Sequence, residues 1–219
     1  PIFMIVSAAI PGAQIFPAVI AGIGAFTAFL AATMGCVQRE IKKVLACSTI
    51  SQLGFMFLAL GVGGLMTGDF GAGYAAGTLQ LAVHAIFKAL LFLGAGAVLH
   101  SVESIYMDEI GGLRKKMPIT FVCMLIGALS LSGIPPFAGF FSKESIFEVL
   151  WTGGQTNAFI AVLFGIAAVT AVFTVFYSFR LIGLTFFGPE SKHVKELERE
   201  HGVHEAPAVV WVPLVILAI

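Results

Sequence analysis

Three polar side chains interrupt the apolar stretch Leu79–Leu99 at intervals of four residues. They are Gln80, His84 and Lys88. Because an α-helix turns once every 3.6 residues, this spacing places them on one stripe of a helix, roughly 12 Å long. Histidine and lysine bind and release protons, whereas an arginine would stay charged. The stripe is therefore expected to face neighbouring helices and to hold a file of water, with His84 and Lys88 able to carry protons.

A simpler reading assigns these residues to helix packing alone. Gln80 and His84 would then bond between helices, and Lys88 would pair with a buried carboxylate. For Gln80 we favour this structural role, because an amide does not titrate. For Lys88 we favour proton transfer, since an ionisable residue at membrane depth is costly and usually marks a proton or ion path.

A second lysine follows a predicted helix break. Pro135 and Pro136 interrupt the apolar run 118–151 near its middle. Proline lacks an amide donor and clashes with the carbonyl four residues earlier, so the helix is expected to break or kink here. Unwound backbone at membrane depth is tolerated where it is buried in protein or lines a wet cavity.

Ser142, Lys143 and Glu144 come directly after this break. A discontinuous helix with a charge beside its broken turn is typical of ion-coupled transporters. The alternative is a plain proline kink, in which Lys143 pairs with Glu144 or Glu148. We favour the transporter reading, with Lys143 as a second proton carrier.

The composition indicates a polytopic membrane protein. Hydrophobic residues make up 58% of the 219 residues and charged residues 11%, with a formal net charge of zero. Soluble domains usually carry roughly 25% charged residues. We therefore expect an integral, multi-pass protein of a bacterial or archaeal cell membrane, or of an organellar membrane.

The apolar runs predict an all-α fold, a bundle of transmembrane helices, because lipid leaves no partner for unpaired backbone groups and strand alternation is absent. Short turns rich in glycine and polar residues, at 67–73 and 152–157, separate some of the runs. The expected spans are Ile15–Val37, Lys43–Met66, Tyr74–Leu99, Pro118–Trp151, Ala158–Ile182 and the start of a sixth near Ala206.

Basic residues support this topology. Ten of the twelve lysines and arginines follow the first, third and fifth spans, which places all ten on one side of the membrane. The turns after the second and fourth spans hold none, as the positive-inside rule expects of a cytoplasmic face and its opposite. The two that remain are Lys88 and Lys143. The ten are Arg39, Lys42, Lys43, Arg114, Lys115, Lys116, Arg180, Lys192, Lys195 and Arg199.

For the other polar groups we favour structural roles. Thr170, Thr174 and Tyr177 share a helix face, and we expect their hydroxyls to bond to backbone or to neighbouring helices. The cluster 47–52 lines water only if its helix packs against Lys88. His201, His204 and Glu205 lie in a hydrophilic stretch, where a solvated connection is favoured over a metal site.

No cofactor or metal is expected in this chain. The three cysteines stand singly in or beside apolar runs, and there is no glycine-rich nucleotide loop after a strand and no haem attachment signal. The mixed charges of the hydrophilic stretch do not indicate nucleic-acid binding.

Four ordered motifs resemble the largest antiporter-like membrane subunit of respiratory complex I, the chain L family of proton-conducting transporters. The resemblance covers nearly the whole chain, and related subunits occur in multisubunit sodium/proton antiporters. The motifs are REIKKVLACSTISQLGFMFLALG (39–61), VHAIFKALLFLGAG (83–96), DEIGGLRKKMP (108–118) and LSGIPPFAGFFSKESI (131–146).

This resemblance implies an inverted-repeat fold and a role for individual residues. Lys88 matches the central lysine of the proton path, Lys143 the lysine on the second broken helix, and His84 a histidine between them and solvent. Lys42 or Lys43 matches basic residues at the start of a helix. Many members carry histidine where this chain has Gln80, so a relay there would use water or amide hydrogen bonds.

The resemblance also implies a domain division. Residues 1–14 would end a preceding helix and loop, 15–182 would form the second five-helix repeat, 183–205 a hydrophilic loop, and 206–219 the start of a further helix. We expect the chain to be an internal piece of a longer protein, because both ends read as parts of apolar helices.

The implied function is proton translocation in a complex I-like NAD(P)H:quinone oxidoreductase, or one with a related donor. The chain would act as a subunit of this enzyme without a redox centre of its own. Its partners would be other membrane subunits, the bilayer and protons. Alternatives are a subunit of a sodium/proton antiporter or membrane-bound hydrogenase, or a structural membrane scaffold.

Overall fold

The computed structural model describes residues 14–66, 70–200 and 202–219. Over these residues the chain is helical, apart from connections and one isolated bridge between Glu40 and Tyr106. The predicted all-α bundle with a broken helix is therefore confirmed for the described part. The helices are α2 (Ile15–Val37), α3 (Ile41–Leu65), α4 (Phe70–Val102), α5 (Pro118–Ser132), α6 (Ala138–Gly154), α7 (Ala158–Phe186), α8 (Lys192–Glu200) and α9 (Ala208–Ala218), with 3-10 turns η1 (Met107–Glu109) and η2 (Leu113–Lys115).

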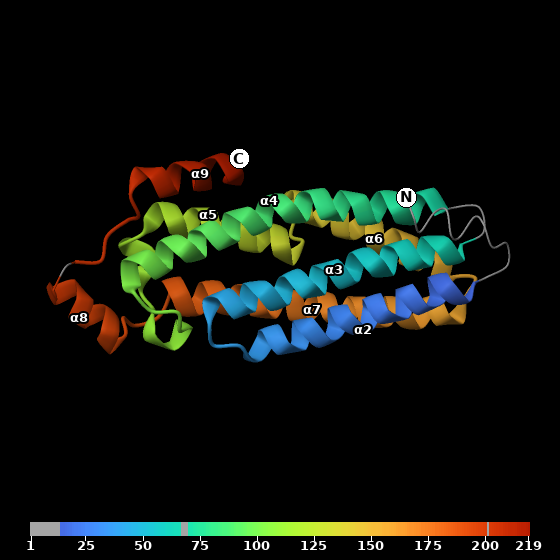
Figure 1. Ribbon diagram of the computed structural model, residues 1–219, viewed down its shortest axis with the longest axis horizontal. Helices are drawn as coiled ribbons and strands as arrows, with labels where there is room; N and C mark the ends of the chain where they lie inside the picture. The colour runs from blue at the N-terminus through green and yellow to red at the C-terminus, as the bar shows by residue number, and fades with distance from the viewer. Residues whose placement is uncertain (1–13, 67–69, 201) are drawn as a thin grey trace.

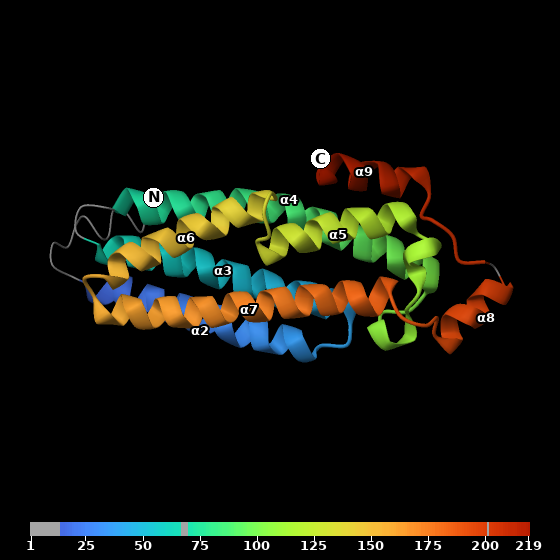
Figure 2. The same ribbon diagram turned by 180° about the vertical axis from the view of Figure 1, so that it is seen from behind.

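The four longest helices run lengthwise through the molecule (Figures 1 and 2). Among the described residues, α2, α3, α4 and α7 are long and apolar enough to cross a membrane. The fourth predicted span is two helices, α5 of 15 residues and α6 of 17 residues. Each is shorter than the roughly 20 residues that one span needs. Figure 2 shows that the two follow one another along the bundle beside α4.

The loops that carry the basic residues meet at one end of the bundle. The amide of Ile41 donates to the carbonyl of Ile105, which joins the α2–α3 turn to the segment after α4. Arg180 of α7 donates to the carbonyl of Gln38 at 2.6 Å. Lys116 contacts two carboxylates of the segment after α7. The predicted one-sided distribution of charge is therefore confirmed, and Figure 1 shows this end at the left.

Glycines allow α2 and α3 to pack closely. A Cβ atom on Gly24, Gly54 or Gly61 would lie 2.4 to 2.5 Å from a backbone nitrogen of the facing helix. Small residues at such crossings let helix backbones approach in membrane proteins. The buried apolar residues of the bundle form two clusters, one that includes Leu45 of α3 and Leu90 of α4, and one that includes Phe55 of α3 and Ile146 of α6.

The start of α4 corrects one prediction. The expected turn 67–73 lies partly outside the described residues, and from Phe70 onward the chain is already helical. Gly73 does not form a turn but a close helix crossing, because a Cβ atom there would lie 2.5 Å from the carbonyl oxygen of Ala59 in α3.

The hydrophilic stretch also differs from its prediction. Helix α7 continues to Phe186, beyond the expected end at 182, and the stretch 183–205 contains α8 rather than only loop. Apolar residues continue to the end of α7, and α8 is strongly amphipathic, with Val194 fully buried. The segment 1–14 lies almost wholly outside the described residues, and the division into repeats stays a prediction.

Candidate functional site

Lys88 lies near the middle of α4 and points into the bundle. Only 6% of the residue is exposed. Its amine donates to the carbonyl oxygen of Leu45 at 2.8 Å and to the hydroxyl of Ser48, both on α3. It also lies 5.8 Å from the ring centre of Phe92, at the limit of a cation–π contact. All of these partners are neutral.

Gln80 and His84 lie on the same face of α4 as Lys88, towards the N-terminal end of the helix. Both are buried. The side-chain amide of Gln80 donates to the Gln52 carbonyl oxygen of α3 at 2.7 Å. The His84 ring packs edge-on against Phe87, and its Nδ1 atom has no hydrogen bond within the described part of the chain. The predicted polar stripe is therefore confirmed as an internal feature.

Lys143 lies in the first turns of α6 and is 5% exposed. Its amine donates to the carbonyl oxygen of Leu131 at 2.6 Å. Leu131 belongs to the last turn of α5, where helix carbonyls lack partners within the helix. The negative end of a helix dipole favours a cation. The break thus creates the acceptor that holds the second buried amine.

The chain between α5 and α6 fixes this arrangement. Gly133 adopts a φ of 74°, and its amide donates to the carbonyl of Ser130. A left-handed glycine followed by prolines is a common end for a helix. Pro135 and Pro136 come next, and both are exposed. The amide of Gly139 then donates to the hydroxyl of Ser130 at 3.2 Å, which ties the start of α6 to the end of α5.

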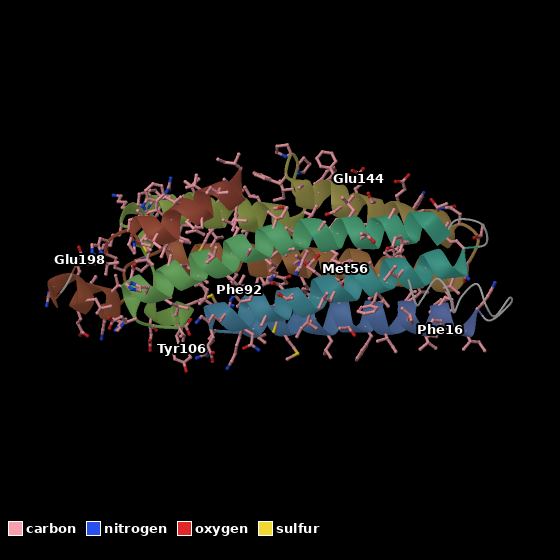
Figure 3. All side chains as sticks on the ribbon, turned by 45° about the horizontal axis from the view of Figure 1, so that its top comes forward. Phe16, Met56, Phe92, Tyr106, Glu144 and Glu198 are labelled. Carbon is pink, nitrogen blue, oxygen red and sulfur yellow. The ribbon has the colours of Figure 1, made fainter. Side chains whose placement is uncertain are left out.

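Neither buried lysine has a carboxylate partner among the described residues. The ion pairs there all lie at the basic end of the bundle. Glu144 and Glu148, offered as partners of Lys143, are exposed, and Figure 3 shows Glu144 at the outer edge of α6. The reading of a kink stabilised by an ion pair is therefore wrong, because helical side chains meet at spacings of three or four residues, whereas Glu144 and Glu148 are one and five residues from Lys143.

The secondary candidates divide into two groups. Ser142 is buried beside Lys143, and its hydroxyl bonds to the carbonyl of Gly139. Lys42 and Lys43 are exposed at the start of α3, where Lys43 pairs with Glu40 at 2.5 Å. These two basic residues lie on the surface of the charged end, apart from the buried amines.

Sequence reasoning missed the main-chain acceptors of both amines. The carbonyls of Leu45 and Leu131 carry no signal in the sequence, since every residue has one. Ser48 and Gln52 belong to the cluster 47–52, which was expected to matter only if its helix packed against Lys88. The structure shows that packing directly.

Glu205 also has a role that the sequence did not indicate. Its carboxylate accepts from the amides of Ile119 and Thr120 and from the Thr120 hydroxyl, at 2.8, 3.3 and 2.5 Å. It therefore caps the N-terminus of α5, where the first amides lack helical partners. Among the described residues no group of histidine, cysteine and carboxylate side chains could hold a metal ion. His201 lies outside them.

Two amines without counter-ions can bind and release protons, because no fixed negative charge holds the proton in place. No hydrogen bond between described residues joins His84 to Lys143, so a connection between them requires water. This geometry and the topology agree with the motifs noted in the sequence. Residues 2–174 match the family described as NADH:quinone oxidoreductase/Mrp antiporter, transmembrane. The chain belongs to this family. It is accordingly an integral membrane protein with the antiporter-like fold.

Individual relatives and structures agree with this assignment. The chain is 44% identical to NADH-quinone oxidoreductase subunit L of Rhodobacter capsulatus over 210 residues, which cover 90% of the chain and 27% of that protein. The chain spans about a third or less of the length of the curated relatives it matches.

Two solved complexes contain similar subunits. One is the membrane-bound sulfane sulfur reductase, an archaeal respiratory membrane complex, with 31% identity and a TM-score of 0.80 over 93% of this chain and 31% of that one. The other is the Mrp complex of a Dietzia species, with 28% identity and a TM-score of 0.78 over 97% of this chain and 21% of that one. The fold is thus shared by redox-linked and antiporter complexes.

Proposed function

We propose that this chain forms one proton path of a membrane subunit in a complex I-like NAD(P)H:quinone oxidoreductase. The observation that carries the proposal is the pair of buried amines, Lys88 and Lys143, held by neutral oxygen atoms. Burying an unpaired charge costs on the order of several kcal/mol. A purely structural role would not offset a cost of this size. Redox chemistry would take place in other subunits, and this chain would contribute proton transfer alone.

The order of the carriers follows from the direction of α4. The helix runs towards the basic end, so Lys88 lies one turn closer to that end than His84 does. Protons entering from the cytoplasmic side would reach Lys88, pass through His84 and water to Lys143, and leave near the turn 152–157. Like charges in a low-dielectric interior repel, so a charge arriving from a neighbouring subunit would drive a proton off one amine.

The second candidate function is sodium/proton antiport, because the Mrp complex shares the fold. The two ammonium groups argue against a sodium ion on this path. A bound metal cation would meet their repulsion, and no described carboxylate lies beside either amine to offset it. An amine carries a proton directly.

The test replaces each amine in the complete complex. Lys88→Met and Lys143→Met keep length and burial but remove the titrating group. Each is expected to lower proton translocation in proteoliposomes by about a hundredfold or more, the range that proton-transfer groups usually contribute. Lys195→Met, exposed in α8, is the matched control and should pump normally.

Assembly of each variant is checked by the yield of intact complex. Normal pumping by both buried variants would show that the chain is a structural scaffold. Pumping that requires sodium in the medium, with sodium moved in the opposite direction, would favour the antiporter instead.

A further inference from the structure

Tyr177 is the largest fully buried side chain of the described residues, with 1% exposed. It lies on the inward face of α7 with Thr170, Thr174 and Ser178. Those three hydroxyls donate to carbonyls of their own helix at 2.7 to 3.0 Å. The hydroxyl of Tyr177 has no hydrogen bond within the described part of the chain. The ring is packed, but its hydroxyl lacks the bond to backbone or to a neighbouring helix that was expected for this face.

The hydroxyl lies close to the side chains of Ser48, Gln52 and Thr174. Two of these belong to the site. Ser48 accepts the hydrogen bond of the Lys88 amine, and Gln52 accepts that of Gln80. The tyrosine oxygen is thus near one member of the lysine group and one member of the glutamine pair.

The same region contains two more unpaired polar atoms. The Nε2 atom of Gln52 and the Oε1 atom of Gln80 are buried without partners in the described residues. Leaving a buried polar atom unpaired costs roughly 1–3 kcal/mol, so such atoms are usually completed by ordered water. A buried water needs several polar partners. Here it would find a donor on Gln52, an acceptor on Gln80 and the Tyr177 hydroxyl.

The ring of Tyr177 is buried beside α2. It packs against Gly35 of α2, where a Cβ atom would lie 3.3 Å from the tyrosine ring. The thiol of Cys36 is the titratable group that faces the tyrosine from α2. From α3 it faces neutral groups, and Lys88 of α4 reaches it through Ser48. A neutral hydroxyl held at this point can both donate and accept.

We propose that Tyr177 is a relay residue, whose hydroxyl passes protons between the Lys88–Ser48 group and the water bound at the Gln52–Gln80 pair. The inference rests on the proposed function and adds α7 to the path. In each transfer the tyrosine oxygen accepts a proton from one side and forms a new O–H bond. Its original O–H bond breaks, and that proton passes to water on the other side. The hydroxyl is neutral before and after, and rotation about the C–O bond resets it.

The first test is Tyr177→Phe in the intact complex, which keeps the ring and removes only the relay oxygen. Proton translocation is expected to fall about a hundredfold, the lower end of what proton-transfer groups contribute, and its solvent isotope effect to change, while uncoupled electron transfer stays normal. Tyr106→Phe is the matched control, because Tyr106 is exposed at the basic end and should pump as the wild type does. Figure 3 shows this control position.

Lys88→Met is measured alongside. If Lys88→Met loses pumping while Tyr177→Phe pumps normally with an unchanged isotope effect, the relay is overturned and the proposed function stands. If both pump normally, the proposed function itself fails, and the relay fails with it.

A second variant covers loss of assembly in Tyr177→Phe. A fluorinated tyrosine incorporated at position 177 keeps the size and the hydroxyl but makes the hydroxyl more acidic. A relay predicts a displaced pH profile of proton translocation, since donation and acceptance both change. A space-filling role predicts the wild-type profile, and that result would overturn the inference.

Discussion

Replacement of Gly139 by alanine tests the helix break most directly. A Cβ atom at this position would lie 1.8 Å from the carbonyl oxygen of Ser130 and 2.6 Å from its carbonyl carbon. These are backbone atoms of α5, so no side-chain rotation relieves the clash. Either α6 moves away from α5 at its first turn, or the chain does not adopt this arrangement.

The size of the movement follows from the contact distance. Carbon and oxygen atoms in ordinary contact lie roughly 3.5 Å apart, and the Cβ atom would lie at 1.8 Å, so the two backbones must separate by about 1.7 Å. Lys143 is one turn further along α6, and its 2.6 Å bond to Leu131 would stretch to roughly 4 Å, beyond hydrogen-bond length. Overpacking of this kind costs about 1–3 kcal/mol or more. A displacement of about 1 Å at a reacting group can lower a rate on the order of a hundredfold.

The assay compares Gly139→Ala with Gly165→Ala in the assembled complex. Gly165 lies within α7 and has nothing within 4 Å of its ideal Cβ position, so the same substitution there should be neutral or slightly stabilising, by up to about 1 kcal/mol. Thermal unfolding and proton translocation are measured for both. A Gly139→Ala complex that unfolds and pumps like the wild type would refute the close crossing and its role in placing Lys143.

Two further predictions concern the basic end of the bundle. Glu205→Ala removes three hydrogen bonds to the start of α5, and we expect it to lower stability by about 1–3 kcal/mol. The unfolding temperature should therefore be lower than that of the control Glu196→Ala. Equal unfolding temperatures would contradict the capping role of Glu205. Hydrogen bonds with the Lys116 ammonium and the Val203 amide hold the pKa of Glu198 below its usual 4.5. The stability that the Glu198 carboxylate contributes is therefore present above pH 4.5 and lost as the pH falls through the lower folded-state pKa. The difference in unfolding temperature between wild type and Glu198→Gln should shrink in acid. A difference that stays constant with pH would exclude a stabilising Lys116–Glu198 pair.

The helical architecture was predictable because local chemistry dictates it. Long apolar runs have to satisfy their backbone groups internally in lipid, and this leaves helices as the solution. Adjacent prolines cannot continue a helix, so the break after Ser132 also followed from the residues alone. Close helix crossings were harder to predict. Gly71 and Gly73 resemble a turn in the sequence, although both lie in α4.

The candidate site was predictable for side chains that are unusual in lipid. Lys88, His84 and Lys143 were found because a charge in an apolar run has few structural explanations. Tyr177 was assigned to packing, since a tyrosine in a membrane helix usually has that role. Its unpaired hydroxyl depends on what α3 places opposite it, which no spacing along α7 indicates.

The sequence by itself determined that this chain spans a membrane as helices, that one helix is broken, and that two lysines are buried. Those properties depend on residue type and on neighbours within a few turns. Only the tertiary structure decided what holds the lysines: the Leu45 carbonyl and Ser48 hydroxyl for Lys88, and the Leu131 carbonyl for Lys143. Such partners come from other helices, and which acceptor faces an amine depends on how the helices cross.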